Sequence, residues 1–117
     1  MVAVVEDDAS YRAAVQRLLH SACFSALTFG SAEDFLNSGQ QQQTGCLIAD
    51  IRMPGMSGLD LQAKLNAEHC PIPTIFVTAH GDEKMRLQAL RAGAVKFLTK
   101  PFDARTLLEA VRVALQD

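Results

Sequence analysis

The chain has 117 residues, of which 49% are hydrophobic and 21% charged, and its 13 acidic and 11 basic side chains give a formal net charge of −2. This length suits a single domain over residues 1–117, which should bury about two-thirds of its extended surface. The composition excludes a disordered or collagen-like chain, and the small net charge argues against direct nucleic-acid binding.

Membrane and secretory classes are also disfavoured by the sequence. A bilayer-spanning helix needs about 20 consecutive apolar residues, and no run of that length occurs. The N-terminus lacks the basic segment and the small-residue cleavage site of a signal peptide. We therefore expect a cytoplasmic protein that does not contact a membrane.

The first half of the chain alternates short apolar runs with helical patterns. Residues 2–5 form an apolar run that stops at Glu6, Asp7 and Asp8, as a strand buried on both faces stops at a polar rim. Apolar residues from Tyr11 to Leu19 then recur at helical spacing. Further strands are expected at 25–29 and 46–49, a short helix after Ser31, and a polar surface loop at residues 40–43.

The second half repeats this alternation. Ser57 is a suitable N-cap for a third helix, which Pro71 and Pro73 prevent from continuing. Strands are expected at 74–77 and 95–98, a fourth helix at about 82–92, and a final helix capped by Asp103. Five alternating strand–helix units predict an α/β fold in which helices cover both faces of a doubly wound parallel sheet.

In such a sheet, functional residues gather where the strands end, at the carboxyl edge. The expected strand ends supply Asp7 and Asp8, Asp50, Thr78 and Lys100. Carboxylates a few ångströms apart destabilise one another unless a cation joins them. We therefore expect a Mg²⁺ site, with Asp8 and Asp50 as direct ligands, Asp7 bound through water, and a backbone carbonyl just after Asp50. One acid of the pair also suits the N-cap of the first helix.

This arrangement predicts phosphoryl transfer. The Asp50 carboxylate would attack phosphorus and form an aspartyl phosphate. Lys100, the hydroxyl of Thr78 and the metal ion would each stabilise one of the phosphoryl oxygens.

Four segments carry a family resemblance: VVEDD, LIADIRMPGMSG, VTAHGD and LTKPF. Together, in this order, they resemble the receiver domain of two-component response regulators, most closely the FixJ-like branch whose receivers are joined to LuxR-type DNA-binding domains. The resemblance implies a flavodoxin-like or CheY-like sheet with strand order 2-1-3-4-5, and a cis peptide bond between Lys100 and Pro101.

The resemblance also implies roles for individual residues. Asp50 would be the phosphoacceptor, Lys100 the phosphoryl clamp, and Thr78 and Phe97 the switch pair. Mg²⁺ or Mn²⁺ would be held by the site acids, and the backbone carbonyl would be that of Arg52. Asp7 and Asp8 would be the acids of this metal site.

The implied partners are a sensor histidine kinase, a LuxR-type output domain and a second copy of the chain. The copy would bind, upon phosphorylation, through the fourth helix, fifth strand and fifth helix. The domain would be a signalling switch that catalyses only its own phosphorylation and dephosphorylation. Arg52 and His80, each two residues beyond a key position, are hypothesised to tune the access of water to the phosphoaspartate.

Each site residue has a plainer interpretation, such as a turn aspartate for Asp50, a solvated lysine for Lys100 or a core aromatic for Phe97. Two alternative functions also stay open. A pseudo-receiver would share the fold but serve only as a protein-binding surface. A phosphatase of the haloacid-dehalogenase type is disfavoured, because its nucleophile would follow the first strand and not the third.

Overall fold

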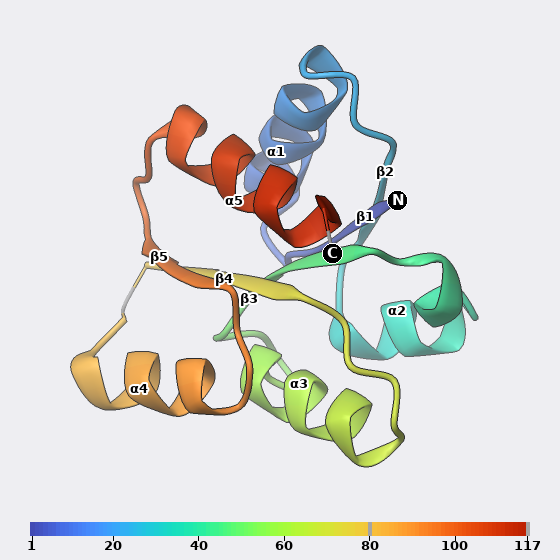
Figure 1. The fold of residues 1–117 in the computed structure, drawn as a ribbon, viewed down its shortest axis with the longest axis vertical. Helices are drawn as coiled ribbons and strands as arrows, with labels where there is room; N and C mark the ends of the chain where they lie inside the picture. Colours follow the sequence, from blue (N-terminus) through green and yellow to red (C-terminus); the bar gives the residue numbers. More distant parts are fainter. Residues whose placement is uncertain (80, 117) are drawn as a thin grey trace.

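A computed structural model of the chain describes residues 1–79 and 81–116. Its centre is one parallel sheet with strand order β2-β1-β3-β4-β5, which confirms the expected doubly wound α/β fold (Figure 1). The strands are β1 (Val2–Val5), β2 (Ala26–Phe29), β3 (Cys46–Asp50), β4 (Thr74–Thr78) and β5 (Lys96–Thr99).

Helices cover both faces of this sheet. The helices are α1 (Ala9–Ser21), α2 (Ala32–Asn37), α3 (Gly58–Ala67), α4 (Glu83–Arg91) and α5 (Ala104–Gln116). Helices α1 and α5 lie on one face, and α2, α3 and α4 lie on the other (Figure 1). Among the described residues, no helix is both long enough and apolar enough to cross a membrane.

Two apolar clusters hold the layers together, because successive strand residues point to opposite faces. Val4 of β1 packs with α1 and α5, in a cluster that includes Leu19 and Leu107. The adjacent Val5 packs toward the other face, in a cluster that includes Phe35 and Leu61. The three central strands are buried along their whole length, as their continuous apolar runs predicted.

Side-chain caps set where most helices begin. Asp8, Ser31, Ser57 and Asp82 each accept a backbone hydrogen bond from the first turn of the helix that follows. At α3 the cap is reciprocal, since Asp60 accepts a hydrogen bond from the backbone N–H of Ser57. These caps therefore fix the residue and the direction at which the chain enters each of these four helices.

The structure refines the expected boundaries. Helix α1 begins at Ala9, two residues before the apolar pattern, and the expected loop at 40–43 contains a 3₁₀ turn at Gln41–Gln43. Strand β5 lies one residue later than expected. The peptide bond between Lys100 and Pro101 is cis, which confirms the inference from the family resemblance.

Candidate functional site

The carboxyl edge of the sheet gathers charged and hydroxyl side chains from four strands. Glu6 follows β1, Asp50 and Thr78 are the last residues of β3 and β4, and Lys100 follows β5. The N–H of Lys100 donates to the carbonyl of Thr78 over 2.8 Å, which ties the end of β5 to β4. The strand ends thus bring together Asp50, Thr78 and Lys100, as the sequence predicted.

Lys100 bridges two carboxylates at the centre of this edge. Its Nζ lies 2.5 Å from Oε1 of Glu6 and 3.0 Å from Oδ2 of Asp50. The three side chains are 13%, 3% and 9% exposed, so water screens these contacts less than it would screen a surface pair. The plainer interpretation of Lys100 as a solvated lysine is therefore wrong.

Burial and ion pairing act in opposite directions on these groups. Desolvation raises the pKa of Glu6, and the hydrogen bond from Lys100 only partly offsets that effect. For Lys100, desolvation lowers the pKa, but hydrogen bonds to Glu6 and Asp50 outweigh it, so the pKa is raised overall. Lys100 is consequently held in its ammonium form, whereas the buried Glu6 carboxylate is less stable than one in water.

The acidic cluster differs by one residue from the expected one. Carboxylate oxygens of Glu6, Asp7 and Asp50 lie within 4.8 Å of one another, in the part of the chain that the structure describes. Asp8 does not belong to this group. Its Oδ1 instead accepts hydrogen bonds from the backbone N–H groups of Ser10 and Tyr11, 3.0 and 3.1 Å away. Asp8 is exposed and caps α1, so the expected position of Asp8 in the cluster is corrected, and Glu6 takes that place.

The loop after β3 is pressed tightly against Asp50. The N–H of Arg52 donates to Oδ1 of Asp50 over 3.1 Å, and the N–H of Gly58 donates to the carbonyl of Ile51 over 2.9 Å. A Cβ atom at position 58 would collide with the backbone oxygen of Asp50, so only glycine fits there. Both carboxylate oxygens of Asp50 thus have a partner, Arg52 for Oδ1 and Lys100 for Oδ2.

The expected switch residues lie beside this site. Thr78 is 1% exposed, and Phe97 is half-buried against the apolar cluster under α2, α3 and α4. Gly81 lies in close contact with both residues. A Cβ atom built on it would lie 2.6 Å from the ring of Phe97 and 3.0 Å from the methyl group of Thr78. Gly81 belongs to the segment VTAHGD, but the sequence alone does not indicate this contact, because it arises only where the loop after β4 meets a ring from β5.

Two expected residues of the pocket rim have different outcomes. The side chain of Arg52 is exposed at the edge of the β3–α3 loop. His80 lies outside the described residues. The hypothesis that this pair tunes hydrolysis therefore stays a prediction.

The donor set fits a hard divalent cation. Three carboxylates share a small volume, and one ammonium group offsets only part of their charge. Oxygen ligands are those that Mg²⁺ and Mn²⁺ prefer, and within residues 1–79 and 81–116 no thiol or imidazole belongs to this group. The residues that could hold such an ion are Glu6, Asp7 and Asp50, with Asp7 the most exposed of the three.

A doubly wound α/β domain with a lysine-bridged acidic cluster at its carboxyl edge has the general plan of a phosphoacceptor domain. Comparison with known proteins identifies the family to which this domain belongs. The family model for the response regulator receiver domain matches residues 2–112, so the chain belongs to the receiver domain family of two-component response regulators.

Individual relatives agree with this assignment and with the FixJ-type branch. Nodulation protein W of Bradyrhizobium diazoefficiens is 45% identical over 99% of this chain and 51% of its own length. The transcriptional regulatory protein FixJ of Azorhizobium caulinodans is 40% identical over 97% of this chain and 54% of its own length. A solved structure of the response regulator StyR is 49% identical, with a TM-score of 0.91, over 98% of this chain and 58% of StyR. The chain thus spans about half the length of the curated relatives it matches.

Proposed function

We propose that the domain accepts a phosphoryl group on Asp50 from the phosphohistidine of a sensor histidine kinase. The observation that carries this proposal is the Lys100 ammonium, which contacts Asp50 and Glu6 together at the edge of the sheet. An oxygen of Asp50 would attack phosphorus while the phosphorus–nitrogen bond breaks, and the imidazole nitrogen of the kinase would keep the electron pair. Lys100 would then neutralise one phosphoryl oxygen, and the Thr78 hydroxyl would donate to another.

Glu6, Asp7 and Asp50 are the residues that would hold Mg²⁺ or Mn²⁺, together with the Arg52 backbone carbonyl implied by the family resemblance. The bound ion would offset the negative charge of these carboxylates and of the incoming phosphoryl group. In our proposal Asp8 serves the site indirectly, since its cap fixes the start of α1 next to Asp7. The domain would catalyse its own phosphorylation and dephosphorylation, and no other reaction.

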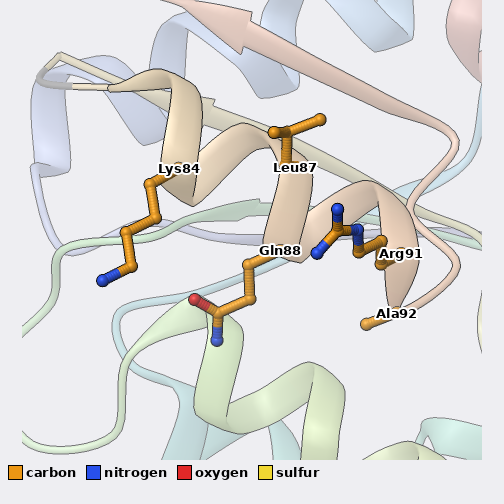
Figure 2. Close-up of a pocket in the computed structure, with 5 residues that line it drawn as sticks. All are labelled: Lys84, Leu87, Gln88, Arg91 and Ala92. Atoms are coloured by element: carbon orange, nitrogen blue, oxygen red, sulfur yellow. The ribbon is translucent and has the colours of Figure 1, made fainter.

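Phosphorylation would be read out on the face formed by α4, β5 and α5. Drawing the Thr78 hydroxyl toward the phosphoryl group would free space into which Phe97 can follow. The outer face of α4 has a shallow pocket of about 520 Å³, lined by Lys84, Leu87, Gln88, Arg91 and Ala92 (Figure 2).

This surface supports a phosphorylation-dependent homodimer. Leu87 of α4 and Val113 of α5 are large apolar side chains that are 39% and 55% exposed.

The relatives named as transcriptional regulators support a DNA-binding output domain of LuxR type in the full-length protein. We place the domain in the cytoplasm, where a kinase obtains its phosphoryl group from ATP.

The phosphoacceptor can be tested with a small phosphodonor. Incubation with acetyl phosphate and Mg²⁺ should add one phosphoryl group to the wild-type chain, measured by intact mass, and hydroxylamine should remove it. Asp50→Asn should gain no mass, whereas Glu109→Gln, an exposed carboxylate on α5, should react like the wild type. A wild-type chain that stays unmodified would instead support the pseudo-receiver.

A further inference from the structure

The ammonium group of Lys100 has a third neighbour besides its two carboxylates. Its Nζ lies over the ring of Tyr11, 4.1 Å from the ring centroid. The negative face of an aromatic ring attracts a cation at this distance. Three side chains, Glu6 and Tyr11 from the start of the chain and Asp50 from the end of β3, therefore contact one ammonium group.

The Tyr11 ring is itself held in place from two sides. The backbone N–H of Tyr11 donates to the capping carboxylate of Asp8, and this hydrogen bond fixes Tyr11 in the first turn of α1. The ring packs edge-on against Phe102, with centroids 5.8 Å apart and an interplanar angle of 60°. Phe102 follows Lys100 by two residues, so the ring joins the start of α1 to the segment that carries the lysine.

We propose that Tyr11 is a positioning residue for Lys100, whose ring keeps the ammonium group aimed at Asp50 while a phosphoryl group arrives and leaves. The proposal rests on the phosphoacceptor role of Asp50 proposed above. A lysine side chain has four flexible bonds, so it loses much conformational freedom when its ammonium group is held at one point. The ammonium group is also strongly hydrated, and it loses part of that hydration there. The ring limits that freedom and excludes water from one side of the charge.

This role matters most when the partners of Lys100 change. Before transfer, Nζ donates to Oδ2 of Asp50, and after transfer it must donate to a phosphoryl oxygen. The Tyr11 ring contacts the ammonium group without using a hydrogen-bond donor. It can therefore hold Lys100 in place in both states, which a further carboxylate could not do without competing for the same donors.

A purely structural role for Tyr11 makes a different prediction. The ring also lines a shallow apolar pocket of about 270 Å³ with Leu18 and Phe102, where it could act only as a hydrophobic cover. In that case Leu or Met at position 11 should serve equally well. If the ring face acts on Lys100, Phe should replace Tyr, because it keeps the aromatic face and lacks only the hydroxyl, whereas Leu and Met should not.

The experiment compares the wild type with Tyr11→Phe, Tyr11→Leu and Tyr11→Met, each checked for folding by urea denaturation. Rates of adduct formation from acetyl phosphate and Mg²⁺ are measured by intact mass. We expect Tyr11→Phe to react at the wild-type rate, and Tyr11→Leu and Tyr11→Met to react about two- to fivefold more slowly. Rates that are equal for the wild type and both aliphatic variants, or a Tyr11→Phe variant as slow as they are, would overturn the proposal.

A spectroscopic measurement tests the contact without any phosphoryl transfer. The ε-protons of Lys100, assigned by their loss in Lys100→Arg, should be shifted upfield by the ring in the wild type and in Tyr11→Phe. The shift should vanish in Tyr11→Leu, and an unshifted wild-type resonance would overturn the contact. The two proposals fail separately: a wild type that forms no adduct refutes the role of Asp50, whereas equal rates in all variants refute only the role of Tyr11.

Discussion

At the scale of single residues, the run Glu6-Asp7-Asp8 shows how three adjacent carboxylates acquire three environments. Glu6 directly follows β1 and is buried against Lys100, Asp7 is exposed within the acidic cluster, and Asp8 caps α1. The sequence indicated an acidic site here and placed Asp7 and Asp8 in it, whereas the structure places Glu6 and Asp7 there. That difference depends on where the helix begins, and the apolar pattern becomes clear only at Tyr11.

Substitutions at Asp7 and Asp8 should separate metal binding from capping. Asp8→Ala should lower the free energy of unfolding by about 1 kcal/mol, because two N–H groups of α1 lose their acceptor, whereas Asp8→Asn should change it little, since asparagine is also a good cap. Both variants should bind Mg²⁺ with nearly wild-type affinity. Asp7→Asn should bind it at least about tenfold more weakly, because it removes a charged ligand of the proposed site.

Urea denaturation and Mg²⁺ titration by calorimetry would measure the two effects. A loss of Mg²⁺ affinity in Asp8→Asn that matched the loss in Asp7→Asn would contradict the assignment of Asp8 as a cap.

At the scale of elements, the sequence predicted the strands and helices in their correct order. The central strands were clear because they are buried on both faces and appear as apolar runs, such as residues 46–49, which end at Asp50. The edge strand β5 is less buried, and its expected range was displaced by one residue. The close contact of Gly81 with Phe97 could not be predicted, since it arises where the β4–α4 loop meets a ring from β5.

That contact predicts a specific effect of Gly81→Ala. The added methyl group would lie 2.6 Å from the ring of Phe97, so the ring or the loop must move, and overpacking of this kind costs about 1–3 kcal/mol. Gly30→Ala is the matched control, because the nearest atom to its methyl group would be Nη1 of Arg12 at 3.4 Å, which is an ordinary van der Waals distance. The control should change stability by less than about 1 kcal/mol.

Chemical denaturation of both glycine variants would measure this difference. Equal stability of Gly81→Ala and the wild type would mean that Phe97 moves outward without cost, contrary to the packing argument.

At the scale of the whole molecule, the site exists only because the fold is complete. Lys100 and Glu6 are 94 residues apart in the chain, and Lys100 and Asp50 are 50 apart, yet the parallel sheet brings all three to one edge. The general rule for parallel sheets predicted this meeting of strand ends. The ion pair with Glu6 and the ring of Tyr11 over Lys100 depend on side-chain directions, which the order of strands does not specify.

The repulsion between the carboxylates gathered at this edge destabilises the fold, and bound Mg²⁺ should reduce that repulsion. The free energy of unfolding should rise with the logarithm of Mg²⁺ concentration once the proposed site begins to fill, reaching about 2.7 kcal/mol at a hundredfold excess over the dissociation constant. Asp7→Asn should show much less of this increase at the same concentrations. Urea denaturation across a Mg²⁺ series, with NaCl at matched ionic strength as the control, separates specific binding from screening. An equal increase with NaCl, or in Asp7→Asn, would contradict a bound ion, because screening acts on all exposed carboxylates, whereas a site requires this cluster.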